Sequence, residues 1–169
     1  TELAGRKMTG LLVASLYPGL FFLLLCLMRR DVPHGPGWIV LSLKTAFFSD
    51  TGAYFAGRFL GKHKLSPRIS PAKTVEGAVG GLAAGLLSGL LAHFIYLPSL
   101  SLPEALALGF AGSAVGQVGD LVVSLLKRAS KTKDTGLFFP GHGGIMDRMD
   151  GAVFVTGLIW LYLSVRGIA

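Results

Sequence analysis

A polar stretch from Ser124 to Asp150 stands out in a chain that is otherwise strongly apolar. Its 27 positions hold five basic side chains, three aspartates, one histidine and four glycines. Glycines let backbone amides approach an anion closely, and the basic side chains would surround that anion. Asp147 and Asp150 are three residues apart, which places both carboxylates on one face of a helix. The stretch therefore predicts a site for phosphates and a hard cation.

The apolar segment before this stretch carries a carboxylate of its own, Asp120. At about 100° per residue it lies on a face of small and polar residues that leads to the basic cluster, namely Gly109, Ser113, Gly116, Asp120, Ser124 and Lys127. A carboxylate in an apolar span needs a counter-charge, and a divalent cation is the economical one. With Asp147 and Asp150, three oxygen ligands could converge on Mg²⁺, which prefers oxygen ligands to thiols.

His142 lies among the glycines of the stretch, and three roles are open to it: general base, hydrogen-bond donor to a phosphate, or structural imidazole. A phosphate nucleophile is already an anion near neutral pH and needs no base. We therefore place phosphate contact or a structural role ahead of base catalysis.

A second basic loop, KHKLSPRISPAKTVEG, runs from Lys62 into another apolar segment. Ser70 is a good N-cap with Pro71 at the first helical position, and Thr74 would cap a slightly later start. In either case Lys73 and Thr74 sit at a helix N-terminus, where free N–H groups and the positive end of the dipole attract phosphate. An ordinary capped helix with a snorkelling lysine is an equal alternative.

Two charges, Lys44 and Asp50, fall inside an apolar segment. Charged side chains at such depth cost at least ~2.5–3.5 kcal/mol each, so they indicate function by default. Lys44 and Asp50 are six positions apart, so their side chains point about 120° apart around a helix axis. This direction is unfavourable for an ion pair between them. We therefore expect Asp50 to face a cavity rather than to form a structural pair with Lys44.

The elements that must position these residues are apolar. The chain has 169 residues, 51% hydrophobic and 15% charged, with a mean hydropathy of +0.61, whereas a soluble domain has about 25% charged residues. Five segments approach the ~20 residues that cross a bilayer as a helix: Gly10–Met28, Gly37–Leu60, Val75–Leu97, Leu102–Leu126 and about Gly144–Val165. We predict an all-α protein, a polytopic transmembrane bundle of about five spans, in preference to a hydrophobic soluble helical domain.

The distribution of charge gives this bundle an orientation. The chain has 16 Lys and Arg against 9 Asp and Glu, a net charge of +7. If the loop 58–74 is cytoplasmic, the N-terminus and the loop 127–148 lie there too, because the segments alternate. Twelve of the 16 basic residues then share that side, as the positive-inside rule requires. The charge therefore indicates membrane lipid and phosphorylated substrates as partners, and no nucleic acid.

Small residues predict how the helices pack. Gly77, Gly81, Gly85 and Gly89 recur every four residues, so they form one helix face that another helix can approach closely. Such faces would also serve a homodimer.

Three stretches resemble one known family, the phosphatidate cytidylyltransferases, also called CDP-diacylglycerol synthases. Ser124–Asp150 resembles the complete family signature, through S-x-L-K-R, K-D-x-G and F-P-x-H-G-G-I-x-D-R-M-D. Ser49–Arg58 (S-D-T-x-A-Y-x-x-G-R) and Ser70–Gly77 (S-P-x-K-T-x-E-G) are also similar to that family. Family members are typically longer, so the chain resembles their C-terminal half. We expect residues 1–169 to form a single transmembrane catalytic domain.

The resemblance implies Mg²⁺-dependent transfer of CMP from CTP to phosphatidate, giving CDP-diacylglycerol and pyrophosphate, with a second cation as a further candidate. It places the active site at the cytoplasmic face of a bacterial inner membrane. Asp120 and Asp147 would be metal ligands, and the catalytic set would be Asp120, Asp147, Asp150, Lys127 and His142. The residues expected to contact phosphate are Lys73, Thr74, Lys127, Arg128, Lys133, His142, Gly143, Gly144 and Arg148, with Asp50 in the cavity wall. Nothing in these residues specifies a pyrimidine, so CTP rests on the resemblance alone.

Three alternatives belong to other classes. An ion- or proton-coupled transporter would explain Lys44, Asp50 and Asp120, but not the glycine-rich basic loop. A CDP-alcohol phosphotransferase would need D-x-x-D-G followed by further aspartates, and no Asp follows Asp150. A catalytically silent lipid-binding module is the third.

Overall fold

The computed structural model describes residues 2–67, 69–129 and 149–169, with side chains from Tyr17 onward. Within these ranges the chain is mostly helical. The helices are α1 (Glu2–Asp31), α2 (Gly35–Leu60), α3 (Val75–Leu91) with its π-helical continuation η1 (Ala92–Tyr96), α4 (Leu102–Ala129) and α5 (Asp150–Val165). Each of the five predicted apolar segments coincides with a helix, although α5 begins later than its segment.

The second basic loop departs from the all-α prediction. It forms a short antiparallel hairpin of β1 (Lys64–Ser66) and β2 (Ser70–Thr74), with Lys64 opposite Thr74. Ser70 lies in β2, so the expectation that it caps the next helix is wrong. Thr74 is the N-cap of α3, and its side-chain oxygen accepts a hydrogen bond from the Gly77 N–H at 3.1 Å. The later of the two predicted helix starts is therefore confirmed.

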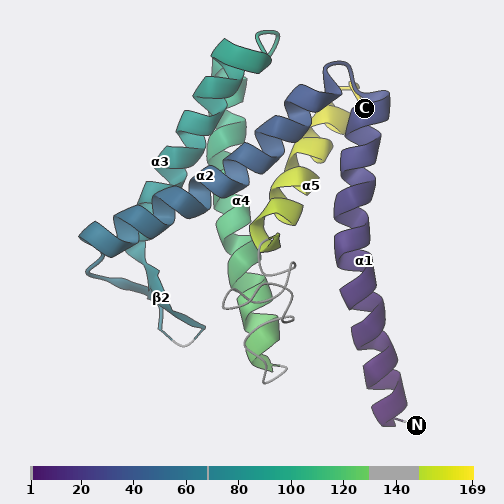
Figure 1. Ribbon diagram of the computed structural model, residues 1–169, viewed down its shortest axis with the longest axis vertical. Coiled ribbons are helices and arrows are strands. Elements are labelled where there is room, and N and C mark those ends of the chain that lie inside the picture. Colours follow the sequence, from purple (N-terminus) through teal and green to yellow (C-terminus); the bar gives the residue numbers. More distant parts are fainter. Residues whose placement is uncertain (1, 68, 130–148) are drawn as a thin grey trace, which may run out of the picture.

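The helices alternate in direction (Figure 1). α2 crosses α3 and α4, and α5 lies between α4 and α1. The hairpin, the start of α1 and the end of α4 lie towards one end of the molecule, and the turns 32–34 and 97–101 lie at the other. The fold thus brings the hairpin with Lys73 to the same end as the last turn of α4, as the alternation of segments predicted.

The glycine face of α3 packs against two neighbouring helices of the same chain. A Cβ added at Gly77 would lie 2.8 Å from the Ala53 carbonyl oxygen of α2, and one added at Gly85 would lie 2.6 Å from the Gly109 carbonyl oxygen of α4. Backbones this close leave room only for hydrogen, so the predicted small-residue packing is confirmed. Because α2 and α4 occupy this face, it is not available for contact with a second copy, and the expected homodimer stays a prediction.

Buried hydroxyl groups join the same three helices. Thr45 Oγ1 and Ser88 Oγ are 3.0 Å apart, and Ser49 Oγ and Ser113 Oγ are 2.7 Å apart. The Ser113 hydroxyl also lies 2.9 Å from the Gly81 carbonyl oxygen. Such satisfied polar groups specify the register of the helices in an apolar interior.

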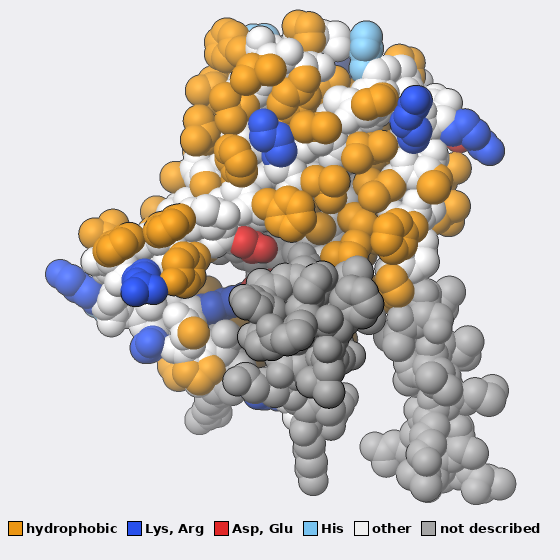
Figure 2. Space-filling view, in the orientation of Figure 1, with side chains coloured by type: hydrophobic (Ala, Val, Ile, Leu, Met, Phe, Trp, Pro, Cys, Tyr) orange, Lys and Arg blue, Asp and Glu red, His pale blue; other side chains and the backbone are white. Residues whose placement is uncertain are grey.

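The outer surface is rich in large apolar side chains, which cover much of the face drawn in Figure 2. Among the described residues, two helical stretches are long and apolar enough to cross a membrane, Val75–Tyr96 and Leu102–Arg128. Helix α5 is apolar but shorter. These features support a membrane protein. The number of five spans stays a prediction.

The close approach of α3 and α4 gives a first prediction. Gly85→Ala in the full-length protein should lower stability by about 1–3 kcal/mol, because the added methyl meets the Gly109 carbonyl and the Ser113 side chain. Thermal unfolding in detergent measures the loss. Gly157→Ala is the matched control, since a Cβ there has nothing within 4 Å. Equal stability of the two variants would contradict the packing described here.

Candidate functional site

Four of the expected site residues line one cavity of about 370 Å³. Asp50 comes from α2, Lys73 and Thr74 from the end of the hairpin, and Asp120 from α4. Figure 2 shows acidic and basic side chains around a hollow beside α2. The predicted cavity-facing position of Asp50 is therefore observed, and residues 70 positions apart in the sequence meet at one place.

An ion pair connects the hairpin to α4 across this cavity. Lys73 Nζ lies 2.6 Å from Asp120 Oδ2, and both side chains are partly exposed. Ser124 Oγ, one turn further along α4, donates to Asp120 Oδ1 at 3.4 Å. The pair places one cation and one anion on the cavity wall, where an incoming phosphate would meet the lysine and an incoming metal ion would meet the aspartate.

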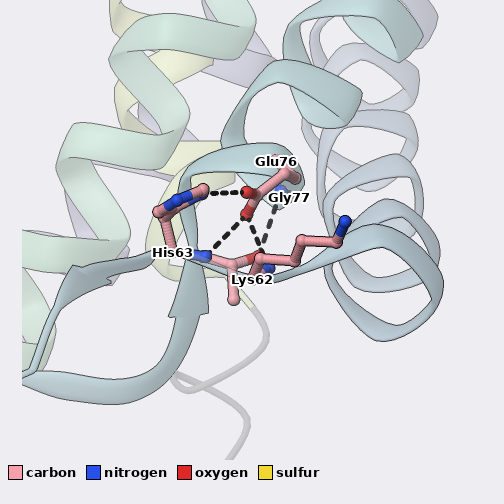
Figure 3. A network of polar contacts seen from close by, with 5 residues as sticks. Lys62, His63, Glu76 and Gly77 are labelled. Atoms are coloured by element: carbon pink, nitrogen blue, oxygen red, sulfur yellow. Dashed lines mark hydrogen bonds and ion pairs between the residues drawn. The ribbon is translucent and has the colours of Figure 1, made fainter.

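Glu76 holds the hairpin in place (Figure 3). Its Oε2 accepts hydrogen bonds from the backbone N–H groups of Lys62 and His63 at 3.1 and 3.2 Å, and its Oε1 lies 2.6 Å from His63 Nδ1. The Val75 N–H donates to the His63 carbonyl at 2.9 Å. Sequence reasoning missed this positioning residue, for which the only signal was a carboxylate in the first turn of a helix that follows a basic loop.

Lys127 and Asp150, two further members of the expected site, contact each other. Lys127 Nζ lies 3.0 Å from Asp150 Oδ2, and the side chains are only 15% and 5% exposed. The Tyr17 hydroxyl donates to the Asp150 carbonyl at 2.9 Å. Asp150 therefore connects α1, α4 and α5. The expected roles of Lys127 at phosphate and of Asp150 near a metal stay predictions.

Lys44, the other charge within an apolar segment, has aromatic surroundings. Its Nζ lies 5.5 Å from the centre of the Phe48 ring and 5.2 Å from that of Tyr96. Such contacts stabilise an ammonium group away from bulk water. They agree with the expectation that Lys44 and Asp50 do not form a structural ion pair with each other.

The donor set of the cavity suits a hard cation. Asp50 and Asp120 bring carboxylate oxygens to one space, and Mg²⁺ is commonly bound through one or two carboxylates together with substrate phosphates. Among the residues that the structure describes, no three His, Cys, Asp or Glu side chains form a metal-binding group. Arg128 is exposed at the end of α4, while Asp147, Lys133, His142, Gly143, Gly144 and Arg148 lie outside the described residues.

Comparison with known proteins places the chain in a family. Residues 2–166 match the cytidylyltransferase family, and the chain belongs to it. It is 40% identical over 152 residues to a phosphatidate cytidylyltransferase of Staphylococcus haemolyticus, an alignment that covers 90% of the chain and 57% of that relative. It is 44% identical over 147 residues to a phosphatidate cytidylyltransferase of Brucella suis, covering 86% of the chain and 54% of the relative.

A phosphatidate cytidylyltransferase of Bacillus subtilis is 37% identical over 152 residues, which cover 90% of the chain and 56% of the relative. The chain thus spans about half the length of the curated relatives it matches. The family agrees with the resemblance found in the sequence, and the transporter alternative has no support from these relatives.

The Glu76 contacts predict a local effect on the hairpin. Glu76→Ala should make the backbone amides of residues 62–66 exchange hydrogen several-fold faster, because three contacts that hold them are lost. Hydrogen exchange of the full-length protein with detection by mass spectrometry measures this. Glu104→Ala is the control, since Glu104 accepts comparable bonds from Ser101 at the start of α4. Unchanged exchange in the hairpin would refute the positioning role.

Proposed function

We propose that the protein containing this chain transfers CMP from CTP to phosphatidate, forming CDP-diacylglycerol and pyrophosphate. The observation that carries the proposal is the cavity in which Lys73, Asp120 and Asp50 converge from three separate elements. The relatives named phosphatidate cytidylyltransferase support the choice of reaction.

The reaction requires no covalent bond between the protein and its substrates. A phosphate oxygen of phosphatidate attacks the α-phosphorus of CTP, and the bond from that phosphorus to the oxygen bridging to the β-phosphate breaks. Pyrophosphate leaves with the bonding electrons. The attacking oxygen is already an anion, so no side chain has to remove a proton from it. Positioning and charge compensation are the main tasks, and a cavity of Asp and Lys side chains beside a capped helix N-terminus is suited to both.

Each described residue then has a distinct task. Lys73 at the cavity wall compensates charge on the triphosphate, and its ion pair with Asp120 sets the position of its ammonium group before substrate binds. Thr74 caps α3 with its side chain and thereby shapes the helix N-terminus beside the cavity. Asp50 lines the same cavity and brings a second carboxylate to it.

Asp120 would hold Mg²⁺, together with Asp147 and with Asp50 nearby. The bound cation would neutralise charge on the transferring phosphoryl group and on pyrophosphate. We further propose that phosphate is contacted by Lys127, Arg128, Lys133, His142, Gly143, Gly144 and Arg148. A second cation would bind at the same site, and Asp150 would lie near it.

The proposed setting is the inner membrane of a bacterium, with about five spans in this chain and the cavity open to the cytoplasm. The positive-inside rule supports this orientation, and so does the grouping of the hairpin with the end of α4 at one end of the fold.

Removing the proposed metal ligand should abolish turnover. Asp120→Asn in the full-length protein should reduce conversion of labelled CTP and phosphatidate at least 100-fold, because the neutral amide is a weak Mg²⁺ ligand. Asp147→Asn should behave similarly. Asp31→Asn is the control, since Asp31 pairs with its neighbour Arg30 at the far end of α1. Near-normal activity of Asp120→Asn would remove this residue from the metal site, and a well-folded parent that makes no product would refute the proposed reaction.

Orientation can be measured by cysteine labelling in intact cells. With the exposed Cys26 replaced by serine, Leu65→Cys in the hairpin should resist an impermeant reagent and Ser99→Cys at the opposite end should react. Both positions are exposed on the protein surface, so access reports the side of the membrane. The reverse pattern would invert the proposed topology.

A further inference from the structure

Arg58, an exposed cationic residue of the cavity lining, has no part in the roles proposed so far. The exposed residues of the cavity lining include Tyr54 and Arg58 of α2 and Leu65 of the hairpin. Arg58 Nη1 donates a hydrogen bond to the Tyr54 hydroxyl at 2.7 Å, and its guanidinium carbon lies 5.9 Å from the centre of the tyrosine ring. The phenol therefore holds the guanidinium at the mouth of the cavity.

The surroundings of the Arg58 guanidinium differ from those of the Lys73 ammonium group inside the cavity. Lys73 is paired with the carboxylate of Asp120. Among the described residues, no carboxylate forms an ion pair with Arg58, whose partner is a neutral hydroxyl. Both groups retain N–H or O–H donors that can turn to an anion, and a guanidinium binds phosphate oxygens in a forked geometry.

Apolar side chains adjoin this cation. Phe55, Phe59 and Leu60 on α2 are 52%, 74% and 64% exposed, and the Phe55 and Phe59 rings are stacked 6.2 Å apart with an interplanar angle of 2°. The Phe55 ring lies 5.4 Å from the Tyr54 ring in an edge-on arrangement, and Phe55 and Arg58 are three residues apart, which makes them neighbours on the helix surface. A phosphate-binding pair bordered by an exposed aromatic strip suits a ligand whose headgroup is anionic and whose remainder is hydrocarbon.

We propose that Arg58 and Tyr54 bind the phosphate of phosphatidate at the cavity mouth, while its acyl chains lie along Phe55 and Phe59. The assignment rests on the proposed function and adds the binding residues for its lipid substrate. A nucleoside triphosphate matches this place less well, because the apolar strip offers no hydrogen-bond partners to its ribose hydroxyls, whereas acyl chains need none. Arg58 thus selects the lipid, and Lys73 with Asp120 serves the nucleotide and the metal.

The kinetic test separates the two substrates. In the full-length enzyme, Arg58→Gln should raise the KM for phosphatidate about tenfold, the loss expected for one charged hydrogen bond, and change the KM for CTP less than about twofold. Tyr54→Phe should show a smaller rise of the same kind, and Arg58→Lys should recover part of the loss. Arg30→Gln, at the opposite end of the fold, is the matched control. A rise in the KM for CTP instead, or a fall in kcat with both KM values unchanged, would overturn the assignment.

A binding test that needs no turnover uses a photoreactive amino acid in place of Phe59. The full-length protein is placed in phosphatidylcholine vesicles with a minor fraction of phosphatidate, irradiated, and the adducts are weighed. Position 59 should capture phosphatidate in excess of its share of the lipid, and Arg58→Gln should remove that excess. The same amino acid at Phe94, which is 69% exposed at the other end of the fold, should show no excess.

Competition identifies the ligand. Added inorganic phosphate and diacylglycerol should leave the phosphatidate adduct at position 59 unchanged. Suppression by inorganic phosphate alone would indicate a simple anion site, and a crosslink to another segment of the protein would show that polypeptide covers the strip; either result overturns the proposal. If lipid is captured selectively but no CDP-diacylglycerol forms, the proposed reaction fails while the lipid site stands.

Discussion

Backbone contact between α3 and its neighbours α2 and α4 is the constraint on which the rest of the structure depends. The glycines of α3 remove the side chains that would otherwise keep the helices apart, and the carbonyl groups of Ala53 and Gly109 fill the space. Dispersion contacts formed at this distance, rather than hydrophobic burial, hold helices together in an apolar medium. The serine and threonine hydroxyls between the helices then determine the register. Asp50 follows Ser49 and Asp120 lies two turns beyond Ser113, so the positions of both carboxylates depend on this packing.

The positions of the helices could be predicted from the sequence. Apolar runs of the length of a bilayer crossing predict helices well, and each of them is a helix in the part of the chain that the structure describes. The four-residue spacing of Gly77, Gly81, Gly85 and Gly89 predicted a close contact correctly. It could not reveal the partner, because a small-residue face is equally suited to another chain and to the same chain. The glycine face of α3 therefore gives the homodimer no support, and the homodimer stays a prediction.

The candidate site was predictable in part. Asp50, Lys73, Thr74 and Asp120 were singled out by charge in apolar surroundings or by place at a helix start, and they line one cavity. The hairpin was not foreseen, because Ser70 and Pro71 are favourable at a helix start and strand pairing depends on Lys64 and its neighbours across the turn. The contacts of Glu76 with residues 13 and 14 positions earlier were equally invisible to local rules. Long-range contacts of this kind require the fold itself.

The buried contact between Lys127 and Asp150 affects how substitutions in the family signature should be interpreted. Replacing Asp150 would leave an ammonium group enclosed with less compensating charge, and it would disturb the contact between α4 and α5. An inactive Asp150 variant would then report faulty assembly of these helices as readily as lost chemistry. Aspartates that stand close together in one signature can therefore be indispensable for unlike reasons, one for the substrate and the other for the architecture.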